Sequence, residues 1–134
     1  MTEYLTKDLL LTPIERRYHE FDAPYNGSMK RVRIRSMTER EKSQWDLSGL
    51  DSKGKIRPEA SVLMRCSLVA LTVVGENNEP LLTVKDAEQL ANQDSALTGA
   101  IYDEAVEFCG IREAQKRRTE KNSEPGETTE TSGD

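Results

Sequence analysis

His19 is the only histidine in the chain, and it stands beside Glu20 on a segment with a strand-like pattern. An imidazole can act as a general base or as a metal ligand, but each role needs partner groups. No motif pairs His19 with a nucleophile, and there is no second imidazole for a histidine-rich metal site. We therefore interpret His19 as a structural residue, at the surface or half-buried, and predict no metal site.

Cys66 and Cys109 are the two cysteines, and a thiolate at either position could serve as a nucleophile or a zinc ligand. They show no Cys-x-x-Cys spacing, and each falls within an apolar pattern of helical period. We favour packing as the role of both. So low a cysteine content fits a reducing cytoplasm better than the disulfide framework of a small secreted protein.

The remaining polar residues do not form a recognisable catalytic set. Asp103, Glu104 and Glu107 have the spacing of a solvated helix face, and an acid–base pair does not follow from abundant carboxylates. The eight glycines match neither of the common phosphate-binding patterns. We predict no catalytic residue and no cofactor, and we expect the protein not to be an enzyme.

A stripe of basic residues follows one predicted strand: Lys30, Arg31, Arg33 and Arg35. It could pair across a hairpin with Glu20 and Asp22, or it could dock an acidic partner or a phosphate backbone. We favour cross-strand pairing. A net charge of -5 and a pI near 5.1 argue against the broad positive field that non-specific nucleic-acid binding requires.

The length of 134 residues suits one domain with a tail. We predict an amino-terminal arm at 1–16, a domain at 17–111 and a disordered polar tail at 112–134, where apolar periodicity ends. Leu9-Leu10-Leu11 in the arm is too short for a signal peptide, and we expect it to pack on the domain. No apolar run approaches the length of a membrane span, so we expect a soluble, unexported protein.

The elements that would position these residues are a β-hairpin at 17–36 and helices near 38–47, 58–74, 84–92 and 95–109. Asn26-Gly27 is a strong hairpin turn, and Thr38 with Glu41 forms a capping box. Thr83 and Asp86 predict a second helix start, and Gly110 a helix stop. The predicted fold class is mainly α, a small helical domain with an amino-terminal hairpin.

One boundary has two interpretations. The β-branched residues Thr72, Val73 and Val74 could extend the end of the 58–74 segment into a strand. The unbroken apolar run of about fifteen residues favours helix throughout.

The order of these elements resembles the tail assembly chaperones of long-tailed bacteriophages. The resemblance rests on four segments of residues 17–111: Val-Arg-Ile-Arg-Ser-Met-Thr-Glu-Arg-Glu at 32–41, Leu-Val-Ala-Leu-Thr-Val-Val at 68–74, Pro-Leu-Leu-Thr at 80–83 and Cys-Gly-Ile at 109–111. It implies a non-catalytic factor of the host cytoplasm that binds the tape measure protein, helps recruit tail tube protein and is absent from the finished virion.

The alternative is a small nucleic-acid-binding or regulatory protein that uses the arginine-rich strand, although nucleic acid is an unfavoured partner for so acidic a chain. Self-association through exposed apolar residues of the leucine-rich arm and the central helix stays open. As partner-binding residues we predict a cationic pair with apolar anchors: Arg33, Arg35, Trp45, Leu81 and Leu82. For Trp45, packing in the core is the competing interpretation, and the one we favour.

Overall fold

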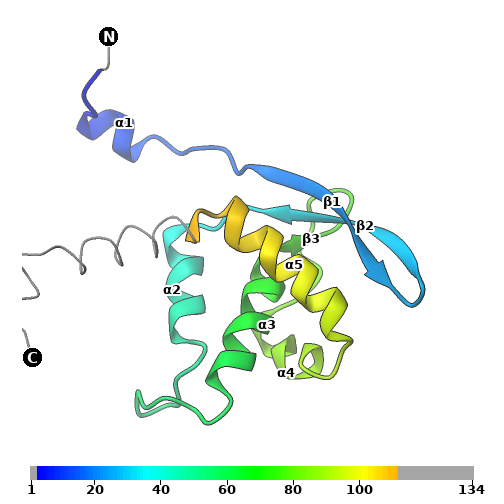
Figure 1. The fold of residues 1–134 in the computed structure, drawn as a ribbon. Helices are drawn as coiled ribbons and strands as arrows, with labels where there is room; N and C mark the ends of the chain where they lie inside the picture. Colours follow the sequence, from blue (N-terminus) through cyan, green and yellow to red (C-terminus); the bar gives the residue numbers. More distant parts are fainter. Residues whose placement is uncertain (1–2, 112–134) are drawn as a thin grey trace, which may run out of the picture.

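The computed structural model describes residues 3–111 (Figure 1), and the predicted disordered tail lies outside them. The elements in chain order are α1 (Lys7–Leu11), β1 (Tyr18–Tyr25), β2 (Ser28–Arg35), α2 (Glu39–Leu47), α3 (Ala60–Thr72), β3 (Val73–Val74), the 3-10 helix η1 (Val84–Asp86), α4 (Ala87–Leu90) and α5 (Ser95–Phe108). The described strands form one antiparallel sheet in the order β1-β2-β3; α5 packs against β1, and α3 packs against α5, α4 and α2.

The prediction of a mainly α fold is wrong, because this sheet and the helices together make an α+β fold. The error lies at the end of the central helix. Val73 and Val74 leave α3 and pair with Ile34 and Arg33 of β2. β-branched side chains fit a pleated, half-buried surface well, and here the edge of β2 supplies hydrogen-bonding partners that the length of the apolar run could not reveal.

The predicted β-hairpin is confirmed. Asn26 and Gly27 have φ angles of 54° and 83°, and positive φ at both central residues is what a two-residue type I′ turn requires. The turn sets the register in which Tyr25 faces Ser28 and Tyr18 faces Arg35. One face of the hairpin therefore points toward the core and the other toward solvent.

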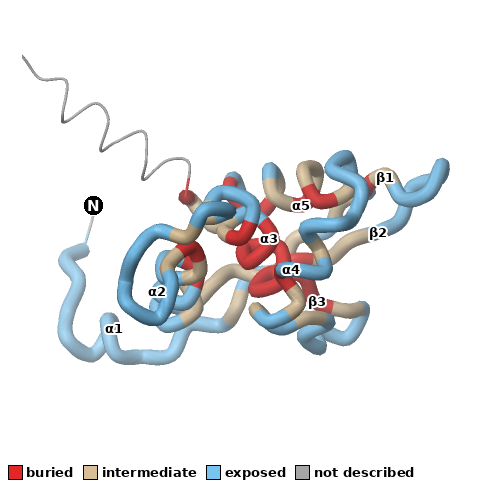
Figure 2. The backbone as a smooth tube through the Cα atoms, turned by 90° about the horizontal axis from the view of Figure 1, so that it is seen from below, coloured by how far each residue is buried: buried red, intermediate tan, exposed pale blue. Residues whose placement is uncertain are grey.

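The core lies between the inner face of the sheet, α3 and α5. Figure 2 shows the buried residues gathered along α3 and the helices beside it. Ile34 of β2 is fully buried and packs in one cluster with Leu68 and Val69 of α3 and Ala105 of α5. The prediction that the 58–74 helix is the central one is confirmed for Ala60–Thr72.

The capping predictions hold in most respects. Thr38 and Glu41 form the expected capping box at the start of α2, and Gly110 has the left-handed φ of 74° that ends a helix. The Asp86 carboxylate accepts a hydrogen bond from the Thr83 N–H at 2.8 Å, as predicted. The segment after it is not one helix at 84–92 but η1 followed by the single turn α4.

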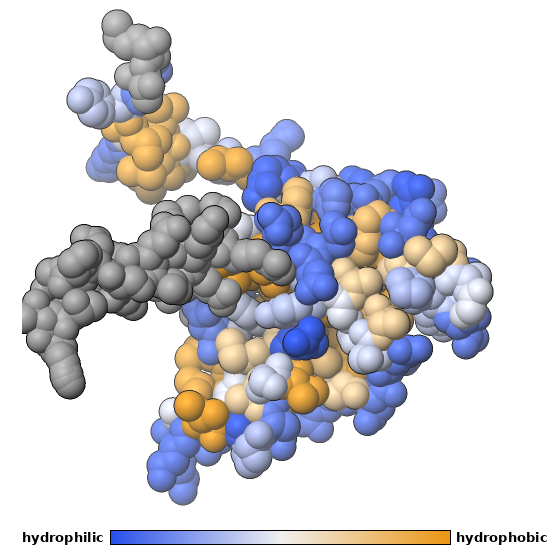
Figure 3. All heavy atoms as spheres, in the orientation of Figure 1, coloured by the Kyte–Doolittle hydropathy of each residue, from blue (hydrophilic) through white to orange (hydrophobic). Residues whose placement is uncertain are grey.

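The amino-terminal arm departs from its prediction. Thr6 caps α1, but none of the residues of this helix is buried, and in Figure 1 it stands away from the domain. The arm therefore does not pack on the domain as expected. Figure 3 shows its apolar side chains as a separate cluster on the surface.

Candidate partner-binding surfaces

The outer face of the sheet carries the predicted basic stripe, and its arginines are paired within the chain. Arg31 Nε donates to Asp22 Oδ1 at 2.8 Å, and Arg33 Nη1 lies 3.0 Å from Glu20 Oε2. These residues face each other directly in the strand register. The hydrogen bond to Asp22 and its charge raise the pKa of the Arg31 guanidinium. The cross-strand interpretation is confirmed for Arg31 and Arg33.

Arg33 also links the hairpin to the turn that follows β3. Its Nε donates to Asn78 Oδ1 at 2.6 Å, and its guanidinium lies 4.6 Å from the centroid of the Tyr18 ring. Lys30 is not part of the same stripe. It faces Ala23 in the register, which places it on the opposite face of the hairpin near the turn.

Three charged side chains meet where the arm joins the domain, and we call them the root cluster: Arg16, Arg35 and Glu41. Glu41 Oε2 lies 2.7 Å from Arg16 Nη2 and 3.4 Å from Arg35 Nη2. Arg16 Nη1 also donates to the Ser36 carbonyl at 3.1 Å, and Arg35 Nε to the Leu71 carbonyl at 3.1 Å. The cluster fixes the end of the arm to β2, α2 and α3 at one point.

The environment of Glu41 lowers the pKa of its carboxyl group. Burial acts to raise this pKa, but it is outweighed by the hydrogen bonds from Arg16 and the Thr38 N–H and by the charges of Arg35 and Arg16. Glu41 is therefore held as a carboxylate. The sequence showed its capping role, but no signal in the sequence linked it to Arg16, which lies 25 residues earlier.

His19 has the structural role that was predicted. Its ring stacks on Phe21 and Phe108, with centroids 5.7 Å and 5.4 Å away, and its Nε2 lies 2.8 Å from Glu104 Oε1. Arg17 covers Phe108, with its guanidinium 4.7 Å from the ring centroid. The group joins β1 to α5.

The two cysteines also behave as packing residues. Cys66 is buried and Cys109 is half-buried, and both are free thiols. Burial raises the pKa of each thiol, which keeps it protonated and less nucleophilic. The prediction of packing roles is confirmed.

The three predicted apolar anchors differ in how far they are exposed. Trp45 is only 7% exposed, and its Nε1 donates to the Met64 carbonyl at 2.7 Å, so it belongs to the core. Leu81 is 55% exposed, whereas Leu82 is half-buried. Only Leu81 offers an open apolar side chain next to the turn that Arg33 contacts.

The largest exposed apolar feature among the described residues was not among the predicted partner-binding residues. It lies in the part of the arm from Tyr4 to Ile14, where six apolar side chains are exposed: Tyr4, Leu5, Leu9, Leu10, Leu11 and Ile14. Leu10 is 66% exposed and Ile14 is 87% exposed. Single exposed apolar residues are common, whereas large contiguous apolar patches are typical of interaction sites. The signal in the sequence was the run of three leucines.

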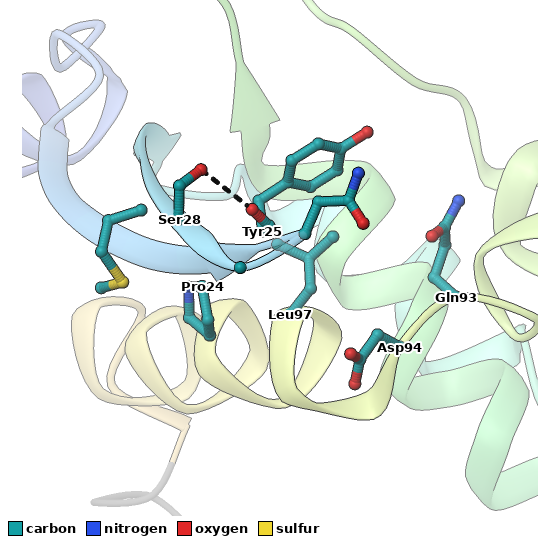
Figure 4. A pocket seen from close by; sticks show the side chains of 9 residues that line it. Pro24, Tyr25, Ser28, Gln93, Asp94 and Leu97 are labelled. Atoms are coloured by element: carbon teal, nitrogen blue, oxygen red, sulfur yellow. Dashed lines mark hydrogen bonds between the residues drawn. The ribbon is translucent and has the colours of Figure 1, made fainter.

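A hollow of about 660 Å³ lies at the opposite end of the hairpin, and we call it the tip hollow. Its lining residues are Pro24, Tyr25, Asn26, Gly27, Ser28, Met29, Gln93, Asp94 and Leu97. Figure 4 shows the hairpin turn above the first turn of α5, with Leu97 pointing up toward Tyr25 and Asp94 at the side. Tyr25 and Met29 are 47% and 60% exposed, so the hollow presents apolar surface to solvent.

Residues 3–111 show neither a metal site nor a membrane span. No group of three or more His, Cys, Asp or Glu side chains there is arranged to hold a metal ion. Within the same residues, no helix has the length and apolar character needed to span a membrane.

Comparison with known proteins found no matching family model, no similar curated protein and no similar solved structure.

Proposed function

We propose that this chain is a non-catalytic tail assembly chaperone of a long-tailed bacteriophage. In this proposal it acts in the host cytoplasm, binds the tape measure protein through the arm and helps recruit tail tube protein before the virion is complete. The observation that carries the proposal is the arm, an apolar segment that the domain leaves uncovered. The order of hairpin, capped helix, central helix and final helix supports the resemblance to this family.

An uncovered arm suits the binding of a helical partner that would otherwise aggregate. Short amphipathic segments bind such partners by apolar contact, and full burial of one leucine is worth about 1.5–3 kcal/mol. The leucines of α1 therefore offer part of the free energy that binding requires, once a groove on the partner covers them. The folded domain behind the arm keeps its own core complete.

The arginine-rich strand gives less support to a nucleic-acid-binding function. Arg31 and Arg33 are paired with Asp22 and Glu20, and Arg35 is paired with Glu41. A phosphate backbone would have to replace these carboxylates, which reduces the net gain from each contact.

Co-expression with the tape measure protein, taken as the longest coiled-coil-like product of the neighbouring genes, tests the proposal. We expect the wild-type chain to co-purify with that protein and to keep it soluble. The triple variant Leu9→Ser, Leu10→Ser, Leu11→Ser should lose both effects. Leu47→Ser is the matched control, because Leu47 is an exposed leucine at the end of α2, outside the arm. Failure of the wild-type chain to bind, with the tape measure protein equally soluble alone, would overturn the proposal.

A further inference from the structure

We infer that Asn26, at the turn between β1 and β2, is a site of spontaneous covalent modification. Its side-chain amide is converted to a carboxylate, and part of the product becomes isoaspartate. Asn26-Gly27 is the only Asn-Gly pair in the sequence. Its φ angles of 54° and 83° form the two-residue turn of the hairpin. The inference concerns this turn alone and is independent of the tape measure protein.

The reaction needs only these two residues and water. The backbone nitrogen of Gly27 attacks Cγ of Asn26 and forms a C–N bond. The Cγ–Nδ2 bond breaks, and the side-chain nitrogen leaves as ammonia with the Gly27 amide proton. The cyclic imide that remains then takes up one water. Opening at Cγ gives aspartate, and opening at the main-chain carbonyl of Asn26 gives isoaspartate, in which the chain runs through Cγ.

Gly27 makes Asn26 reactive, because a residue without Cβ lets other groups approach its backbone closely. The other described asparagines, Asn77, Asn78 and Asn92, precede residues with side chains that crowd the attacking nitrogen. The surroundings of Gly27 are open as well, since an added Cβ would meet no atom within 4 Å. Both residues of the turn are exposed, so water reaches the imide.

Asn78 is the informative comparison, because its φ of 69° is also positive. Its Oδ1 accepts a hydrogen bond of 2.6 Å from Arg33 Nε, which fixes the side-chain amide. Within residues 3–111, no hydrogen bond of this kind holds the side chain of Asn26. The amide of Asn26 can therefore turn toward the Gly27 nitrogen, while that of Asn78 is held by the sheet.

The attack also requires the turn to open, because the hairpin fixes the backbone around Asn26. In the sheet that the structure describes, β3 pairs only with Ile34 and Arg33, so the hairpin is two-stranded from Val32 to the turn (Figure 1). Two-stranded hairpins are marginally stable in water, and such ends open at a free energy well below that of global unfolding. The tip therefore reaches the reactive conformation while the domain stays folded.

The two products affect the turn differently. Aspartate followed by glycine suits a type I′ turn, so this product keeps the hairpin. Isoaspartate adds a backbone carbon, so the pairing of Tyr25 with Ser28 next to the turn loses its register. Both products add a carboxylate to the tip hollow, which Asp94 also lines. Modification therefore changes the charge of this hollow in every modified molecule and its shape in part of them.

Mass spectrometry of the purified full chain after incubation at mildly alkaline pH tests the inference. Trypsin releases residues 18–30, where Asn26 is the only asparagine, and residues 66–85, which contain Asn77 and Asn78 as an internal control. We expect about tenfold more amide-to-acid conversion in the first segment than in the second. Electron-transfer fragmentation identifies the isoaspartate. The same chain unfolded in urea should convert Asn26 about tenfold faster, a factor that corresponds to about 1.4 kcal/mol for opening of the tip.

Gly27→Asp is the matched variant. Aspartate accepts a positive φ better than most residues, but its side chain crowds the attacking nitrogen and should slow conversion of Asn26 about tenfold. If circular dichroism shows that this variant does not fold, the two segments of the wild-type chain decide alone. An Asn26 that stays intact in the folded chain while the urea-unfolded chain converts would overturn the inference. Equal conversion of the two segments, or an unchanged rate in a folded Gly27→Asp variant, would do the same.

Discussion

The outer face of the sheet and the amino-terminal arm both carry residues of the kinds that bind partners. The fold pairs the charged residues of the sheet within the chain, but it leaves the apolar residues of the arm exposed. The arginines of the sheet face carboxylates of the neighbouring strand or of α2, so their charges are balanced within the chain. The leucines of the arm are exposed to solvent, and no residue of α1 is buried. A residue type suggests binding only where the fold has not already supplied its partner, and by this criterion the arm is the better candidate.

The largest effect that separates the two regions should come from the arm. The triple variant Leu9→Ser, Leu10→Ser, Leu11→Ser should weaken tape measure binding by about 100-fold or more, because each lost leucine burial costs about 1 kcal/mol or more. The free energy of unfolding should stay unchanged, since these side chains are exposed in the domain. Pull-down titration and urea denaturation measure the two quantities. A clear loss of stability would show that the arm packs on the domain after all.

Substitution of Glu41 should, in contrast, lower the stability of the domain. Glu41→Gln removes the charge that pairs with Arg16 and Arg35 while keeping an amide that can serve the capping box, and it should lower the free energy of unfolding by about 2 kcal/mol. Thr38→Ala, which removes the capping hydroxyl but leaves the charge, is the matched control at about 1 kcal/mol. Urea denaturation of both variants decides whether the charge of Glu41 or the capping of α2 contributes more to stability. Equal losses in the free energy of unfolding would contradict a stabilising role of the root cluster.

The pH dependence of stability should show whether Glu41 acts through its charge. Because the folded-state pKa of Glu41 lies below its unfolded value, its contribution is fully present above the unfolded pKa and is lost as pH falls through the folded pKa. The stability difference between the wild-type chain and Glu41→Gln should therefore be largest near neutral pH and shrink between about pH 5 and pH 2. Parallel denaturation curves across this range measure it. A constant difference would assign the effect to packing.

The smallest effect should come from the exposed ladder of charges. Glu20→Gln removes the partner of Arg31 and Arg33, but these ion pairs are open to water and screened by salt. The free energy of unfolding should change by less than in Glu41→Gln, and the change should fade as salt is added. Denaturation at low and high salt gives the comparison, and a large, salt-insensitive loss would place Glu20 in a buried network instead.

Features encoded by neighbouring residues could be predicted. The hairpin follows from Asn26-Gly27, the start of α2 from the Thr38 and Glu41 pair, and the end of α5 from Gly110. Each depends on contacts between residues three or fewer positions apart, or on a backbone angle that glycine or asparagine adopts readily. The cross-strand pairing of Arg33 with Glu20 could also be predicted, since a two-residue turn fixes the register.

Features that depend on distant segments could not be predicted in the same way. Val73 and Val74 form a strand only because the edge of β2 lies beside them, and this changed the fold class. Among the predicted partner-binding residues, Arg35 became a member of the root cluster, because α2 and α3 pack against it. Core packing of Trp45 was the favoured interpretation, but its hydrogen bond to the Met64 carbonyl of α3 could not be foreseen. The apolar pattern of the sequence indicates whether a residue is buried, but it does not show which distant segment packs against that residue.

The sequence by itself determined the hairpin, its register and the capped start of α2, because short-range geometry fixes them. It also indicated packing roles for His19, Cys66 and Cys109, although His19 and Cys109 meet partners far along the chain. Only the tertiary structure decided that the arm stands free. The reason is that the root cluster directs the chain away from the domain, and the core is already filled by α3, α5 and the sheet. A run of leucines gains the same hydrophobic free energy whether its own domain or a partner buries it. Only the packing of the rest of the chain decides that these leucines stay exposed and available to a partner.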